Sequence, residues 1–226
     1  MPREKQKAPY HHGDLKNTLI DVALAHISRD GAGSLSLREV ARDAGVSHSA
    51  AYRHFANKEN LLVAIAEQGF RQLGETLGAA AQAHAGDPAR ALQATGVAYV
   101  EFAISHPEHL QVMFGGSIAC PSDYPSLVAA GDETYAALTR TVAEGSKLGQ
   151  LRSGDDAMIA LTCWATVHGL SQLIAGGQIG REAGDASPRS LALAATALVM
   201  QGVNAPAAAA KRSAKVKRRR LKQDVL

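Results

Sequence analysis

The sequence predicts an all-α protein, and three observations carry this prediction. Aromatic residues make up only 4% of the 226 residues, whereas alanine, the strongest helix former, is abundant. Apolar residues recur at helical spacing along most of the chain, and no strand-like alternation of convincing length interrupts them. A hydrophobic content of 46% and a charged content of 20% are ordinary for a soluble protein with a core, and the length suits two compact units.

The composition argues against secretion, a disulfide framework and a membrane span. The N-terminal residues are polar and charged and lack the apolar core of a signal peptide. Cys120 and Cys163 lie far apart, which predicts neither a disulfide framework nor a structural zinc site. No apolar stretch is expected to approach the roughly 18 residues of a membrane span. We therefore expect a reduced, cytoplasmic protein without a metal or other cofactor.

The first domain is predicted over residues 14–74, after a mobile N-terminal arm over residues 1–13. Apolar residues three and four positions apart predict a helix that begins at Asp14 and ends at Gly31. Asn57 is a suitable N-cap for a later, longer helix with an apolar stripe.

Between these helices, the segment 36–55 has the pattern of two short helices joined by a tight turn. Ser36 and Glu39 have the spacing of a capping box, which predicts the start of the first short helix. Gly45 ends that helix, and Ser47 begins the second, which ends near residue 55. The apolar seam between the two helices is predicted to contain Val40, Ala41, Val46 and Ala51.

The second short helix leaves mainly small polar groups and one aromatic ring outside this seam. Such a surface suits insertion into the major groove of DNA, where donors and acceptors contact base edges. Ser36 and Lys58 each stand at the start of a predicted helix. There a hydroxyl or an ammonium group and free backbone N–H groups suit phosphate contacts. The roles of two of these residues remain open. His48 either contacts a base or only faces solvent. The ring of Tyr52 can pack on the preceding helix while its hydroxyl reaches a phosphate.

The second domain is predicted over residues 84–203 and consists of further helices. Asp87 followed by Pro88 suits a helix start, as does Ser187 followed by a proline, and Asp155 opens a third helix in this domain. These helices are predicted over residues 88–106, 127–148, 155–176 and 188–199, with a loop over residues 115–125.

Residues 14–73 resemble the DNA-binding domain of the TetR family of bacterial transcriptional repressors. The resemblance lies in the sequence AGVS, followed by YRHF, a lysine and a Leu-Leu pair, within residues 44–62. It implies that residues 47–55 form the recognition helix, with DNA contacts from Ser36, Arg38, Ser47, His48, Ser49, Ala50, Tyr52, His54 and Lys58. Ala51 is smaller than the residue usual in the family, and Asn60 replaces a common glutamate.

A second resemblance, to TetR-type regulators with a WHG C-terminal domain, lies at Trp164, His168 and Gly169. Trp164 and His168 are four residues apart and share one helical face. Either they line an effector pocket, with Trp164 as its apolar wall and His168 as its polar anchor, or they are packed core residues. The pocket hypothesis assigns ligand binding to Tyr99, Phe102, His106, Phe114, Trp164 and His168.

The net charge of +3 hides a basic tail. Residues 205–226 hold eight lysines and arginines against one aspartate, so the rest of the chain is net negative. The tail is predicted to be disordered. It either adds nonspecific phosphate contacts or only aids solubility.

Taken together, these features predict a homodimeric transcriptional regulator, a repressor that a small-molecule effector releases from a palindromic operator. The alternative is a ligand-independent architectural DNA-binding protein. No catalytic constellation is recognisable, so we expect no enzyme and no membrane partner, and a cytoplasmic, nucleoid-associated location in bacteria. The predicted dimer seam contains Ile159, Leu170, Leu173, Ile174, Leu191, Leu198 and Val199.

Overall fold

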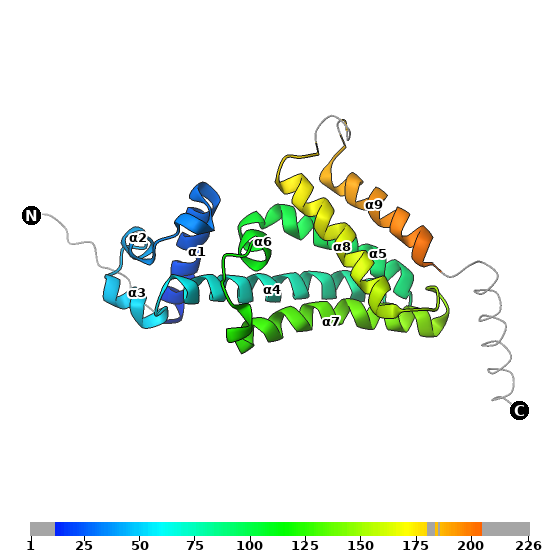
Figure 1. Cartoon of the computed structure of the whole chain (residues 1–226), viewed down its shortest axis with the longest axis horizontal. Helices are drawn as coiled ribbons and strands as arrows, with labels where there is room; N and C mark the ends of the chain where they lie inside the picture. The colour runs from blue at the N-terminus through cyan, green and yellow to red at the C-terminus, as the bar shows by residue number, and fades with distance from the viewer. Residues whose placement is uncertain (1–11, 180–183, 185, 205–226) are drawn as a thin grey trace, which may run out of the picture. The chain divides into compact units, whose positions relative to one another are not determined.

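The computed structural model describes residues 12–179, 184 and 186–204, and these residues form a helical structure (Figure 1). The elements are α1 (His12–Asp30), the short 3₁₀ helix η1 (Ala32–Ser34), α2 (Leu37–Asp43), α3 (His48–His54), α4 (Lys58–Gln82), α5 (Pro88–Ser105), α6 (Pro107–Phe114), the 3₁₀ helix η2 (Pro121–Asp123), α7 (Pro125–Leu148), α8 (Asp156–Ala175) and α9 (Pro188–Val203). Among the described residues, extended pairing is limited to one bridge between Leu151 and Asn204. The predicted all-α class is confirmed.

The described chain divides into two compact units. Unit 1 contains residues 12–69 together with residues 108–128, and unit 2 contains residues 70–107 and the described residues from 129 to 204. Unit 1 thus takes in α6 and the loop after it, which come from the middle of the chain. The predicted domain limits stay predictions. Residues 1–11 of the predicted arm and the predicted tail lie outside the described residues.

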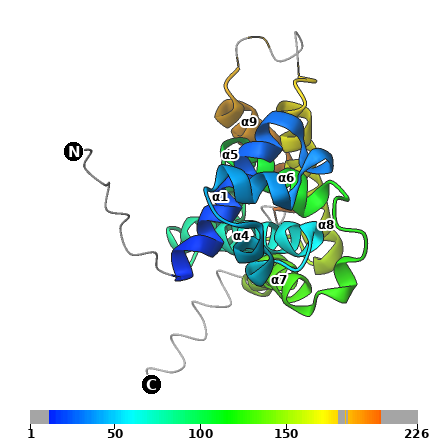
Figure 2. The ribbon, with the colours of Figure 1, turned by 90° about the vertical axis from the view of Figure 1, so that its left-hand side faces the viewer.

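Helices α1, α2 and α3 pack against one another in unit 1 and can be followed as the blue to cyan ribbon in Figure 2. Gly45 joins α2 to α3 with a φ of 69°, a conformation that costs little only for a residue without a side chain. Val40, Ala41 and Ala51 are fully buried between the helices, which confirms most of the predicted seam. This packing fixes which face of α3 points outward.

Side-chain caps define most of the helix starts. Asp87, Asp155 and Ser187 each accept a hydrogen bond from the backbone N–H three residues later, as their positions predicted. Asn57 does the same for α4, with 2.9 Å between its Oδ1 and the nitrogen of residue 60. The capping box predicted at Ser36 is wrong, because its side chain makes no capping bond.

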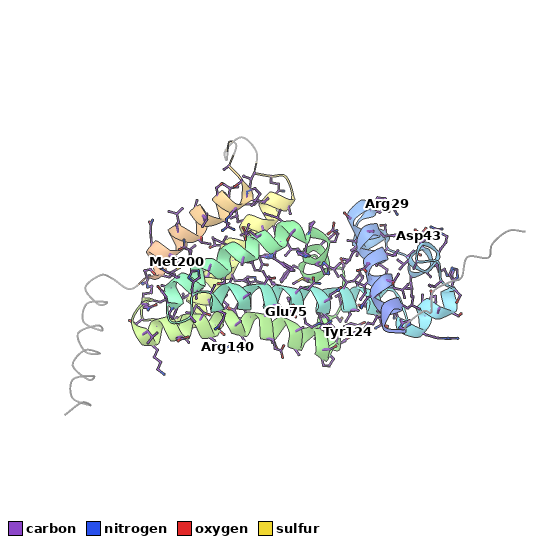
Figure 3. The ribbon with its side chains drawn as sticks, turned by 180° about the vertical axis from the view of Figure 1, so that it is seen from behind. Arg29, Asp43, Glu75, Tyr124, Arg140 and Met200 are labelled. Carbon is purple, nitrogen blue, oxygen red and sulfur yellow. The ribbon has the colours of Figure 1, made fainter. Side chains whose placement is uncertain are left out.

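Unit 2 is organised around α5, α8 and α9, each of which packs against the other two. Their contacts bury a hydrophobic cluster to which α7 also contributes; Met200 on α9, labelled in Figure 3, belongs to it. Its buried members are Leu92, Val142, Leu151, Ile159, Ala160, Cys163, Met200 and Val203. Ile159 therefore lies in the core of its own unit, and not in the exposed seam predicted for it.

Helix α8 is long and apolar enough, by length and composition, to cross a membrane. The expectation that no stretch approaches this length was wrong, because Thr, Ser, His and Gln interrupt its apolar residues without adding charge. One such helix is weak evidence for a membrane protein. Here α8 packs on α5 and α9 through a buried face that includes Ala160 and Val167.

Candidate DNA-binding and effector sites

The outward face of α3 is polar at its start and aromatic further along. Ser47 caps the helix by accepting a hydrogen bond from the backbone N–H of Ala50, and its hydroxyl lies 3.0 Å from that of Ser49. His48 and Ser49 are exposed, and Tyr52 is 44% exposed although it is a large aromatic residue. Tyr52 therefore presents an aromatic ring and a hydroxyl on this outward face.

The opposite face of α3 explains this orientation. Ala51 is fully buried, and Phe55, just after the helix, is 2% exposed. Ala50 and His54 lie at the border and are half-buried. The structure thus brings four of the predicted DNA-contacting residues, Ser47, His48, Ser49 and Tyr52, to the outward side of one helix.

The remaining predicted DNA contacts lie at the starts of α2 and α4. Arg38 is exposed, and Ser36 is half-buried with a hydroxyl that makes no capping bond. Lys58 is half-buried, and its Nζ donates a hydrogen bond of 2.6 Å to the carbonyl oxygen of Gly33. The ammonium group therefore holds α4 to η1, a role that the sequence pattern did not indicate.

A second polar link that the sequence analysis missed joins α1 to α2. Nε2 of His26, a residue only 7% exposed, lies 2.9 Å from Oδ2 of Asp43. Asp43, labelled in Figure 3, also accepts a hydrogen bond from Arg42. The hydrogen bond from Arg42 has the larger effect and that from His26 a smaller one, and both hold the pKa of the Asp43 carboxyl below its usual value. A histidine on the apolar face of the first helix was the available signal, since a buried polar group needs a partner.

In unit 2, three of the six residues predicted to bind an effector lie together. The hydroxyl oxygen of Tyr99 on α5 lies 2.8 Å from Nδ1 of His168 on α8. The Trp164 ring is tilted over that of His168, with 5.8 Å between the ring centroids. Tyr135 of α7, which was not predicted, packs edge-on against Trp164 at a centroid distance of 5.7 Å.

Burial favours the uncharged forms of both Tyr99 and His168. It raises the pKa of Tyr99 to about 12, and the indole N–H of Trp164 acts on the same hydroxyl in the opposite direction. Burial also lowers the pKa of His168 below its usual value. Tyr99 is only 4% exposed, whereas Trp164 and His168 are half-buried and keep some accessible surface.

Two of the other three predicted effector residues form a stacked pair. Phe102 and His106 stack on each other near the end of α5, with 4.5 Å between their ring centroids. Phe114 belongs to unit 1. Cys163 is buried, and burial raises the pKa of its thiol to about 11, which suits an inert core residue.

An open groove of about 490 Å³ lies elsewhere in unit 2, between the start of α8 and the end of α9. Its lining includes the apolar side chains of Met158, Ile159 and Leu198 and the charged side chains of Arg152 and Asp155. None of the six predicted effector residues lines it. No cluster of three or more potential metal ligands occurs among the described residues.

Two family models match the chain. The model described as "Bacterial regulatory proteins, tetR family" matches residues 19–65, which include α2 and α3. The model described as "Tetracyclin repressor-like, C-terminal domain" matches residues 92–198, which include Tyr99, Trp164 and His168. The two matches together span about two thirds of the chain.

Individual relatives agree with these matches. The HTH-type transcriptional regulator AcrR of Shigella flexneri is 39% identical over 62 residues, which are 27% of this chain and 29% of AcrR. A Rhodococcus sp. RHA1 structure, described as a protein with unknown function, is 36% identical with a TM-score of 0.77, over 88% of this chain and 100% of that one. PfmR, a TetR family transcriptional regulator from Thermus thermophilus, shares the fold at 20% identity and a TM-score of 0.66, over 81% and 97% of the two chains.

Proposed function

Because the chain belongs to the TetR family of bacterial DNA-binding transcriptional regulators, we propose that it is a cytoplasmic homodimeric repressor that a small-molecule effector releases from a palindromic operator. The observation that carries the DNA-binding part is the outward face of α3. Its polar residues and the exposed Tyr52 stand opposite a fully buried Ala51, so the helix offers one defined surface to a groove.

The roles on that surface follow from chemistry and position. His48 and Ser49, at the exposed start of α3, are the proposed base contacts, because the N-terminal residues of a recognition helix reach base edges. Tyr52 and Lys58 are the proposed phosphate contacts. Lys58 reaches a phosphate by exchanging the Gly33 carbonyl for a charged acceptor, which makes the stronger hydrogen bond.

Selection of binding sites from random duplex DNA, followed by gel-shift titration, tests this assignment. We expect a palindromic site, as two-fold symmetry requires. His48→Ala should alter the selected sequence. Tyr52→Phe should lower the affinity for every DNA sequence by about fivefold, because one hydrogen bond contributes about 1 kcal/mol. Arg140→Gln, an exposed change on α7 (Figure 3), is the control. An architectural protein would instead select no palindrome and respond to no effector.

The proposed dimer surface is the outer side of α8 and α9. Seven large hydrophobic side chains are exposed among the described residues, and five of them lie on these two helices. They are Met158, Leu161, Leu173, Leu193 and Leu198. No charged residue occurs on α8 after Asp156, so this surface suits burial against a second copy.

Leu198 is 68% exposed and provides the sharpest test of the dimer surface. Burying one leucine contributes about 1.5–3 kcal/mol, and a two-fold interface contains it twice. Leu198→Asp should therefore weaken dimerisation at least about a hundredfold in sedimentation equilibrium. Val128→Asp changes an exposed apolar residue on α7 and should leave the dimer intact. An unchanged dimer in Leu198→Asp would contradict this surface.

Coupling between effector and operator is supported by the chain path of unit 1. The segment 108–128 belongs to this unit, although the chain on either side of it continues into α5 and α7 of unit 2. Glu59 on α4 accepts a hydrogen bond of 3.2 Å from the backbone N–H of Ala119, and Ser126 donates one of 2.5 Å to Glu67. Tyr124 (Figure 3) also lies against Glu59. We propose that effector binding acts on α3 through this segment.

A further inference from the structure

His26 and Asp43 join α1 to the end of α2 by one directional contact. Nε2 of His26 lies 2.9 Å from Oδ2 of Asp43, and His26 is only 7% exposed. Hydrogen bonds from Arg42 and, to a smaller extent, from His26 hold the pKa of the Asp43 carboxyl below its usual value. The group is therefore an ionised carboxylate near pH 7, which can only accept hydrogen bonds. His26 is the donor, with a proton on Nε2.

Asp43 stands at a position that is unfavourable for a carboxylate. It is the last residue of α2, where the helix dipole is negative. It also precedes the cap of α3 by only four residues, in a unit that is proposed to approach the negative phosphates of DNA. Arg42 donates to its other oxygen, but this neighbour belongs to α2 as well. Among the contacts that the structure describes for Asp43, the one with His26 reaches another helix.

The turn after Asp43 passes this constraint to α3. Two backbone hydrogen bonds of 3.0 Å, donated by the N–H groups of Gly45 and Val46, close the turn onto the last residues of α2. Ser47, which caps α3, follows directly. Because the turn is short and closed, a displacement of the end of α2 also displaces the start of α3, where His48 is the first helical residue.

The apolar contacts between these helices constrain their orientation less sharply. Ala41 and Ala51 are fully buried, but the hydrophobic effect that favours their burial is not directional. A hydrogen bond weakens steeply when its angle departs from the preferred range. The bond between His26 and Asp43 therefore selects one orientation of α2 on α1 among those that the apolar contacts tolerate.

On the basis of the proposed function of α3, we infer that His26 is a positioning residue for operator recognition: through Asp43 it fixes the end of α2, and thereby the orientation of α3 toward the base pairs. Contacts to base edges depend on this orientation, because each needs a donor and an acceptor in one geometry. Phosphate contacts carry no sequence information and are made on any duplex. Loss of the link lowers the affinity for the operator and leaves nonspecific affinity nearly unchanged.

Arg29 and Asp30 provide a matched control for this link. Like Arg42 and Asp43, they are an arginine and an aspartate at the last two positions of a helix, and each arginine donates to its neighbour (Arg29 and Asp43 are labelled in Figure 3). Asp30→Ala and Asp43→Ala therefore remove the same charge from equivalent positions. Only Asp43→Ala also removes the partner of His26.

Gel-shift titration of the selected operator and of a scrambled duplex gives the ratio of the two affinities for each variant. We expect His26→Leu and Asp43→Ala each to lower this ratio by about tenfold, which is of the order that one base contact supplies. The double variant should lower it no further than one of them. His26→Gln keeps an N–H donor and should stay within about threefold of the parent protein, and Asp30→Ala should match the parent.

Thermal unfolding of each variant separates positioning from stability. A merely structural link would lower the Tm but leave the affinity ratio of the folded protein unchanged. An unchanged ratio in His26→Leu and Asp43→Ala would overturn the positioning role, as would an equal fall in Asp30→Ala; if His26→Leu does not fold, the ratio in Asp43→Ala decides. A parent protein that selects no operator would instead overturn the proposed function of α3, which distinguishes the two failures.

Discussion

Gly96 sets how closely α5 approaches α8 and α9. A Cβ at this position would lie 2.8 Å from Cγ2 of Thr196 and 3.4 Å from Cγ1 of Val167. Thr196 cannot turn away easily, since it is 5% exposed and its hydroxyl donates a hydrogen bond of 2.7 Å to the carbonyl of Ala192. Overpacking costs about 1–3 kcal/mol, and the helix propensity of alanine returns about 0.8–1 kcal/mol. Gly96→Ala should therefore destabilise the protein by about 1 kcal/mol.

Thermal unfolding followed by circular dichroism, at fixed protein concentration, measures this effect. A loss of about 1 kcal/mol corresponds to a fall in Tm of about 2–4 °C for a chain of this size. Gly78→Ala is the matched control: nothing lies within 4 Å of its added Cβ, so the same propensity should stabilise the protein. Thr196→Ser removes the clashing methyl and should restore the double variant. Stabilisation by Gly96→Ala equal to that by Gly78→Ala would show that Thr196 does not restrict this position, as would a failure of Thr196→Ser to restore the Tm of the Gly96→Ala protein.

Three further predictions concern the sites. Ser47→Ala removes the cap of α3 and should cost about 1 kcal/mol in urea unfolding, whereas Ser49→Ala, which leaves that cap in place, should cost less. Lys58→Met removes the ammonium that donates to Gly33 and should reduce the slope of log affinity against log salt by about one; an unchanged slope would exclude Lys58 from the phosphate contacts. Burial lowers the pKa of His168, so the unfolded chain binds a proton more readily than the native one, and stability falls as the pH drops below about 6.5. In His168→Gln the loss of stability between pH 7 and pH 4 should be smaller than in the parent protein. An identical dependence of stability on pH would show that His168 is not its cause.

Local patterns were sufficient at several positions where a single turn of chain decides the structure. The caps at Asp87, Asp155 and Ser187 depend on a side chain and the N–H three residues later, so sequence spacing alone predicts them. Gly45 is similarly local, because its positive φ follows from the turn between two short helices. The failure at Ser36 shows the limit, since its spacing to Glu39 matches a capping box that the side chain does not form.

Pairings between distant residues could not be predicted from such patterns. Tyr99 and His168 are 69 residues apart, and their hydrogen bond depends on how closely α5 and α8 approach. Both residues were candidates, but nothing in the sequence joined them to each other or separated them from Phe102 and His106. The hydrogen bond between Lys58 and Gly33 is of the same kind, because it depends on how close the start of α4 lies to η1 in the folded chain.

Helix α8 shows why one segment can mislead a hydropathy argument. One side, with Ala160 and Val167, is buried in unit 2, and another carries the exposed Leu161 and Leu173. Trp164, which is half-buried, lies on the same helix. Core packing on one side and the proposed dimer contact on another both favour uncharged residues, which accounts for the absence of charge on α8 after Asp156. Such a helix has the composition of a membrane span, although only part of its surface is buried in its own unit.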